Sequence, residues 1–372
     1  MNRKGVLFYT AILLLSVIGT SAYAGGAYTM TNATDDNQIV VFSRDDTGLL
    51  TKVDTISTGG KGSGGNIDPL ASQGSLILVD ADDIRHGWKH RYGNDREQLL
   101  LAVNAGSNDI SVFRVDGDSI SLSDRIGSGG SFPVSVTADA NMVYVLNNGA
   151  PANITGFRLD RKGRLHAVPH STRMLDAGSY GQVAFDPDGK FLAITDKANN
   201  RLLVYRVGKN GLPSDSPVVT PSSGAVPFGV DFDRKGHLLV VEAGANAVSS
   251  YDINGDGSLQ VISASIPNGQ IATCWIVVNR RGDIVTTNPG TNSLSAFHVR
   301  ARTGEVTLLN GTAGAGNAPL DVDMSRHGRF AYAVDPVAGG VDMFRVENDG
   351  SLTALGTVDA GLAIYAQGMA VR

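Results

Sequence analysis

Seven amide or carboxylate side chains recur along the sequence at similar intervals, and each follows a short apolar run. They are Asn32, Asn104, Asn147, Asp196, Glu242, Asn288 and Asp335. Asn and Asp side chains commonly hydrogen-bond to nearby backbone groups and so stabilise turns. The longer side chain of Glu242 suits such a turn poorly. We therefore predict that Glu242 is a catalytic general base or a ligand-binding group.

A second set of residues precedes other apolar runs and mixes aromatic side chains with amides. Together with Asn104, the predicted substrate-binding residues are Gln73, Gln182, Phe228, Trp275, Asp321 and Gln367. Such side chains can bind a neutral polar ligand, for example a sugar or a lactone. They could instead fill a channel and hydrogen-bond to exposed strand backbone. Lys and Arg are scarce in both sets, which argues against a phosphorylated substrate.

These candidate residues belong to a unit that the chain repeats seven times. Each unit contains a run that ends on an aromatic residue, and these aromatic residues are Phe42, Phe113, Phe157, Tyr205, Tyr251, Phe297 and Phe344. The steps between them are 71, 44, 48, 46, 46 and 47 residues. The long first step indicates an insertion, which we place at about residues 60–96.

Gly-containing turns separate the short apolar runs of each unit, as at Asp188-Gly189 and Asp256-Gly257. Such turns join antiparallel strands because Gly accepts a positive φ, so each unit is predicted to contain four short strands. A unit of this size cannot bury both faces alone, and radial stacking buries them. The sequence therefore predicts an all-β fold, a seven-bladed β-propeller over residues 25–372.

The two ends of the chain predict how the ring closes. Residues 27–31 match the second strand of the other units, and residues 366–371 match a first strand. We expect the C-terminal strand to complete the N-terminal blade, because this pairing removes an exposed sheet edge. In a propeller the first strands line a central channel, so both sets of candidate residues should converge on one mouth of the channel.

Composition excludes some classes of function. The chain has 372 residues and a formal net charge of −5, and its 31 Lys and Arg residues are scattered. A nucleic-acid interface is therefore not expected. The single cysteine, Cys274, cannot form an internal disulfide, and no motif predicts a cofactor.

Residues 1–24 have the features of a secretory signal peptide. Arg3 and Lys4 precede an apolar run over residues 6–18, and small residues follow up to Ala24. The run is shorter than the roughly 20 residues that span a bilayer, so no stable membrane anchor is expected. We predict cleavage after Ala24 and a secreted or periplasmic protein.

The insertion contains a cluster of ionisable and aromatic residues over residues 80–92. His86 and His90 are spaced to share a helix face, and neighbouring acids could complete a metal site. Insertions on propellers more often form solvated lids, which is the interpretation we favour, and no metal site is predicted.

Two segments, residues 183–191 (VAFDPDGKF) and 100–113 (LLAVNAGSNDISVF), resemble the β-propeller lactonase family. This family includes propeller-type 6-phosphogluconolactonases and carboxymuconate lactonising enzymes, and the resemblance extends over residues 26–372. It implies polar catalytic groups at the channel mouth, among them a Glu that ends a second strand, where this chain has Glu242. At places comparable to the family's His, this chain has Tyr180, Phe228 and Trp275.

These features predict an exported lactonase-like hydrolase that acts on a small neutral lactone or sugar-derived ester. The alternative is a non-catalytic propeller that binds a glycan, a peptide or a partner protein through the same face. The full-length resemblance favours the hydrolase, whereas the absence of a matching His favours the binding protein.

Overall fold

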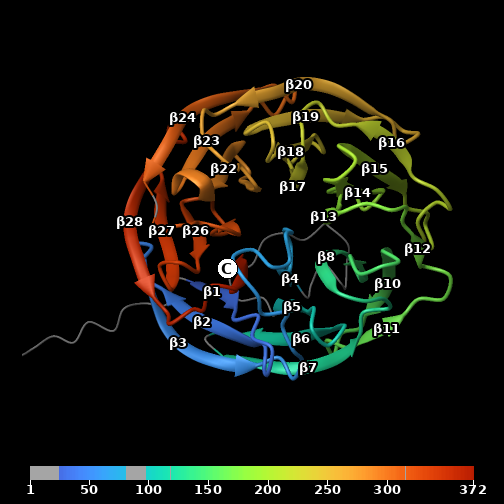
Figure 1. The fold of residues 1–372 in the computed structure, drawn as a ribbon, viewed down its shortest axis with the longest axis horizontal. Helices are drawn as coiled ribbons and strands as arrows, with labels where there is room; N and C mark the ends of the chain where they lie inside the picture. The colour runs from blue at the N-terminus through green and yellow to red at the C-terminus, as the bar shows by residue number, and fades with distance from the viewer. Residues whose placement is uncertain (1–24, 81–97, 118, 315) are drawn as a thin grey trace, which may run out of the picture.

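The computed structural model describes residues 25–80, 98–117, 119–314 and 316–372. These residues form seven antiparallel sheets around one axis, which Figure 1 shows as a ring. The predicted all-β, seven-bladed propeller is therefore confirmed. The predicted signal peptide, residues 1–24, lies outside the described residues.

Each sheet runs from an innermost to an outermost strand, and the blades are numbered from the sheet that contains β1. The innermost strands are β29 (Gln367–Val371), β4 (Leu76–Asp80), β8 (Pro133–Asp139), β13 (Tyr180–Phe185), β17 (Pro227–Phe232), β21 (Trp275–Val278) and β25 (Val322–Met324). The second strands are β1 (Gly25–Met30), β5 (Gln98–Asn104), β9 (Met142–Asn147), β14 (Phe191–Asp196), β18 (Leu238–Glu242), β22 (Asp283–Asn288) and β26 (Phe330–Asp335).

The two outer positions of each blade complete the sheets. The third strands are β2 (Gln38–Arg44), β6 (Asp109–Asp116), β10 (Asn153–Leu159), β15 (Arg201–Arg206), β19 (Ala247–Ile253), β23 (Ser293–Val299) and β27 (Gly340–Val346). The outermost strands are β3 (Leu50–Ser57), β7 (Ser119–Gly127), β11 (Leu165–Ala167) with β12 (Arg173–Met174), β16 (Val218–Pro221), β20 (Leu259–Pro267), β24 (Val306–Gly314) and β28 (Leu352–Asp359).

Blade three departs from the predicted four strands because its outermost strand is broken into β11 and β12, which both pair with β10. Pro169 and His170 lie between the two pieces. Pro has no N–H to donate to the ladder, and His170 has a φ of 60°, so the extended strand is interrupted here.

The C-terminal strand closes the ring as predicted. β29 pairs with β1 in an antiparallel register in which Ala27 lies opposite Val371 and Thr29 opposite Met369. Blade one is therefore built from both ends of the described chain, in the order β29-β1-β2-β3.

The core lies between neighbouring sheets. All seven repeated aromatic residues of the third strands are at most 1% exposed, which explains their regular recurrence. The helix found among the described residues is one 3-10 turn, Pro289–Thr291, and no helix in this part of the chain is long and apolar enough to cross a membrane.

The segment predicted as an insertion is divided by β4, the first strand of blade two. Residues 58–75, which we call the mouth segment, connect blade one to blade two at the end of the channel where the first strands begin. Residues 81–97, which contain His86 and His90, lie outside the described residues.

Candidate functional site

Six of the seven predicted polar residues end the second strands, and Asn32 follows the end of β1 by two residues. All seven are buried, with at most 1% of each exposed. Asn104 illustrates their contacts. Its amide group donates to Asp109 Oδ1 (2.7 Å) and Ser111 Oγ (2.8 Å), and its carbonyl oxygen accepts from Asn37 Nδ2 (2.9 Å). Asn104 therefore joins blade one to blade two, and it does not line the central cavity described below.

Glu242 is fully buried and surrounded by hydrogen-bond donors. Its Oε1 accepts from the Gly224 amide (2.7 Å), Ser249 Oγ (2.7 Å) and Ser222 Oγ (3.2 Å), and its Oε2 accepts from Ser265 Oγ (2.6 Å). Glu242, the last residue of β18, thus connects the loop that follows β16 with strands β19 and β20. The described contacts give Glu242 a structural task, and its catalytic role stays a prediction.

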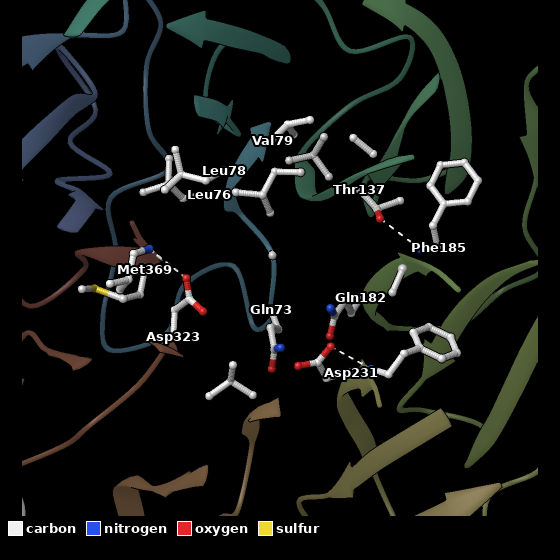
Figure 2. Close-up of a pocket in the computed structure, with 18 of the residues that line it drawn as sticks. Gln73, Leu76, Leu78, Val79, Thr137, Gln182, Phe185, Asp231, Asp323 and Met369 are labelled. Atoms are coloured by element: carbon white, nitrogen blue, oxygen red, sulfur yellow. Dashed lines mark hydrogen bonds between the residues drawn. The ribbon is translucent and has the colours of Figure 1, made fainter. Parts of the chain in front are cut away.

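Gln73 reaches across the channel from the end of the mouth segment. Its amide Nε2 donates to the Ile276 carbonyl (2.8 Å), and its Oε1 accepts from the Ile276 N–H (2.9 Å). Its backbone N–H donates to the Gly181 carbonyl (3.1 Å). Gln73 thereby links the start of blade two to blades four and six, and Figure 2 shows it at the centre of the channel.

An aromatic pair supports residues 71 and 72 of the mouth segment. Trp275 Nε1 donates to the Ser72 carbonyl (2.9 Å), and the Trp275 and Phe228 rings meet edge to face at 5.1 Å. The Lys197 ammonium lies 4.8 Å from the centroid of the Phe228 ring and donates to the Ala71 carbonyl. Burial lowers the pKa of Lys197.

Residues 68–70 of the mouth segment rest on Gln367. Its Oε1 accepts from the Leu70 N–H (2.9 Å), and its Nε2 donates to Asp68 Oδ1 (2.6 Å). Burial raises the pKa of Asp321 to about 7. Burial, followed by the charge of Asp321, raises the pKa of Asp68 to about 8.

Six of the predicted substrate-binding residues thus gather around the channel axis, and Asn104 does not. Four of them, Gln73, Phe228, Trp275 and Gln367, contact or support the mouth segment, so the chain itself occupies the predicted mouth. Their contacts match the alternative in which these side chains fill the channel and satisfy strand backbone. Their role in substrate binding stays a prediction.

A cavity of about 470 Å³ lies inside the ring of first strands. Residues from all seven innermost strands line it. It extends from Gln73, Gln182 and Asp321 to residues just past the strand ends, such as Arg280. Figure 2 shows Gln182 and Asp231 on one side of this cavity and Asp323 on the other, with Gln73 between them.

Asp231 and Asp323 have matching contacts on first strands two blades apart. Asp231 Oδ1 accepts from the Phe232 N–H (2.7 Å), and its Oδ2 accepts from the Val278 N–H of blade six (2.8 Å). In the same way, Asp323 Oδ1 accepts from the Met324 N–H (2.7 Å), and its Oδ2 accepts from the Val371 N–H of blade one (2.8 Å). Each carboxylate therefore satisfies an N–H on the inner, unpaired edge of the next blade.

Both carboxyl groups titrate near neutral pH. Burial raises the pKa of Asp231 to about 6 and that of Asp323 to about 7, although the two backbone N–H groups at each site favour the charged form. The charge of Asp231 contributes to the shift of Asp323, so the two groups are electrostatically coupled. Carboxyl groups with these properties can accept and donate protons at neutral pH.

Gln182 supplies a hydrogen-bond donor beside Asp231. Its Oε1 accepts from the Val230 N–H (2.6 Å), which fixes the orientation of the amide. Its Nε2 lines the cavity and has no hydrogen-bond partner within the described parts of the chain. This N–H pair can donate to the oxygen of a bound molecule.

Sequence reasoning did not identify Asp231 and Asp323, nor three arginines that line the cavity, Arg280, Arg326 and Arg372. Arg326 pairs with Asp80 at 3.8 Å. Lys and Arg are scarce in the two predicted sets of residues, but three arginines line the cavity. Arg280 and Arg326 lie two residues after their first strands, and Arg372 lies directly after β29, so arginines just past the first strands were the available signal.

Within the described ranges, no group of three or more His, Cys, Asp and Glu side chains could hold a metal ion. Of the ionisable cluster predicted over residues 80–92, the structure describes Asp80 alone.

The fold and the cavity define a class, a seven-bladed propeller with a polar central site. The model of the family "Lactonase, 7-bladed beta-propeller" matches residues 154–277 and 182–363, and the chain belongs to this family. A search of curated proteins found no match.

Solved propellers share the whole fold with this chain. A putative 6-phosphogluconolactonase from Bacteroides uniformis is 17% identical, with a TM-score of 0.70 over 92% of this chain and 98% of that one. The corresponding protein of Bacteroides fragilis is 15% identical, with a TM-score of 0.67 over 94% and 98%. The periplasmic gluconolactonase PpgL of Pseudomonas aeruginosa is 15% identical, with a TM-score of 0.66 over 93% and 99%. At these identities the likeness establishes the fold.

Proposed function

We propose that this chain is an exported lactonase that hydrolyses a small lactone or sugar-derived ester in the central cavity. Membership of the lactonase family supports the reaction class. The signal-peptide features of residues 1–24 support export, and one structural neighbour is described as periplasmic. The observation that carries the proposal is the pair Asp231 and Asp323, whose carboxyl groups line the same cavity and titrate near neutral pH.

Lactone hydrolysis needs a base, an oxyanion donor and an acid. Asp231, with the lower pKa, takes a proton from water as the water oxygen attacks the carbonyl carbon. Gln182 Nε2 donates to the oxygen that becomes negative in the tetrahedral intermediate. When this intermediate collapses, the ring C–O bond breaks and Asp323, with the higher pKa, gives a proton to the leaving oxygen. The product is an open-chain hydroxy acid.

A non-catalytic binding protein is the second candidate. Both oxygens of Asp231 and of Asp323 already accept a strand N–H, which is what a purely structural carboxylate would do. A ligand would then be held by the cavity without being transformed.

The two candidates are separated by a panel of five- and six-membered lactones assayed with Asp231→Asn and Asp323→Asn. The control is Asp124→Asn, because Asp124 on the outer strand β7 makes the same two kinds of bond, with Arg125 N–H (2.9 Å) and Leu165 N–H of the next blade (2.7 Å). Hydrolysis that is lost in both cavity variants and kept in the control supports the lactonase. Lactone binding without turnover in the unaltered chain supports the binding protein.

A further inference from the structure

The central cavity continues outward on the side of blades four and five. A second hollow of about 450 Å³ shares Phe185, Asp231 and Phe232 with the central cavity. A third hollow of about 400 Å³ shares Asp186–Asp188 and Arg234 with the second. We call these two outer hollows the radial groove. They follow the turns after β13 and β17, and Phe185 and Asp231 lie on the matching side of the cavity in Figure 2.

Three carboxylates of the radial groove have hydrogen-bond or ion-pair partners within the chain. Asp186 accepts from the N–H groups of Lys190 (2.6 Å) and Phe191 (2.7 Å), and Asp188 pairs with the Lys190 ammonium at 2.7 Å. Asp233 pairs with His237 Nδ1 at 2.7 Å. Asp186, Asp188 and Asp233 in the second hollow are thus engaged by the chain, whereas the exposed Asp252 lines the third hollow and not the second.

Two arginines of the second hollow are not paired in this way. Arg234 and Arg280 are exposed, and neither forms an ion pair or a side-chain hydrogen bond with another described residue. Two guanidinium groups that line the same hollow are suited to an anionic oxygen group, which they can bind in a bidentate manner. The aromatic rings of Phe185 and Phe232 line this hollow too and provide an apolar surface.

We propose that the radial groove binds the distal part of an elongated anionic substrate. The lactone or ester group lies in the central cavity, an apolar or ring-containing portion lies along Phe185 and Phe232, and a terminal carboxylate or phosphate reaches Arg234 and Arg280. This inference rests on the proposed function in that it takes the central cavity as the reacting site. The inferred substrate is a lactone or ester that carries a side chain with a terminal anion, and it is therefore larger than a single unsubstituted lactone ring.

The test compares three δ-lactones: one without a side chain, one with a six-carbon side chain ending in methyl, and one with the same side chain ending in carboxylate. A fourth, ending in phosphate, distinguishes the two anions. Arg234→Ala should raise KM at least about tenfold more for the charged side chains than for the unsubstituted lactone, with kcat changing in parallel for all of them. The control is Arg302→Ala, an exposed arginine on a turn of blade six outside the groove, and it should match the unaltered chain.

Equal KM values for all side chains, or an equal effect of Arg234→Ala on each of them, would overturn the groove proposal. If no lactone is hydrolysed, the corresponding carboxylate-ended hydroxy acid is titrated into the protein by calorimetry. Binding that weakens about tenfold or more in Arg234→Ala, and not in Arg302→Ala, would support the groove while the proposed hydrolysis fails. An absence of binding in the unaltered chain would overturn the groove as well.

Discussion

Asp231→Asn should flatten the dependence of stability on pH. The pKa of Asp231 is about 6 in the folded protein and near 3.8 in an unfolded chain. Between these values the folded state binds more protons than the unfolded state, so stability falls as the pH rises. The cost of the buried charge is fully present above about pH 6, and it is absent below about pH 4.

The magnitude follows from the shift in pKa. A rise from 3.8 to about 6 corresponds to about 3 kcal/mol, since each unit is worth about 1.4 kcal/mol. This is a large part of the roughly 5–15 kcal/mol that stabilises a typical domain. Asp321 and Asp323, with pKa values of about 7, act in the same direction, so the unaltered chain should be markedly less stable at about pH 8 than at about pH 5.

The assay is urea denaturation followed by circular dichroism at about pH 5 and about pH 8. Asp231→Asn should lose about 1.4 kcal/mol less than the unaltered chain over this interval, because about half of the 3 kcal/mol is already lost between pH 4 and pH 5. The variant also loses one backbone hydrogen bond, but it does so at both pH values. Asp124→Asn should keep the slope of the unaltered chain, because Asp124 makes the same bonds outside the cavity. A stability that stays constant or rises from pH 5 to pH 8 would refute the reasoning.

One deletion and two substitutions test other parts of the account. Deleting residues 366–372 removes the buried Met369, Ala370 and Val371 and exposes β1, which should cost about 5 kcal/mol and abolish cooperative melting; a truncated chain that melts like the full one would contradict ring closure. Gln73→Ala leaves backbone groups on blade six unpaired and should lower stability by about 2–3 kcal/mol in thermal or urea unfolding. Glu242→Gln places an amide among four donors and should lower the melting temperature while kcat is kept. The opposite pattern would support the catalytic role predicted for Glu242.

The fold could be predicted from the sequence because its signals are local and repeated. An aromatic residue at a regular interval, with a Gly turn after it, marks each blade, and the aromatic residues prove to be the buried centres of the third strands. Closure by residues 366–371 could also be predicted. The N-terminal unit begins with its second strand, and the C-terminal end of the chain supplies the missing first strand.

The site was predicted only in part, for physical reasons. The sequence places Gln73 at the channel mouth. It does not show that the mouth segment turns inward, where the Gln73 backbone N–H bonds to blade four and its side-chain amide bonds to blade six. The carboxyl groups of Asp231 and Asp323 owe their raised pKa values to burial inside the ring of strands, which no local pattern encodes. Glu242 differs in residue type from the Asn and Asp residues at equivalent positions, which led to the prediction of a catalytic role. In the structure, neighbouring serine hydroxyls and a glycine N–H already donate hydrogen bonds to its carboxylate.

The pH dependence of kcat/KM for hydrolysis of a lactone tests the central claim most directly. A bell-shaped profile with limbs near about pH 6 and pH 7 is predicted, because a coupled pair acts as base and acid. Asp231→Asn should remove the acidic limb and Asp323→Asn the basic limb, with losses of about 100-fold or more, while Asp124→Asn keeps the full profile. A profile and rate that both cavity variants leave unchanged would contradict the account.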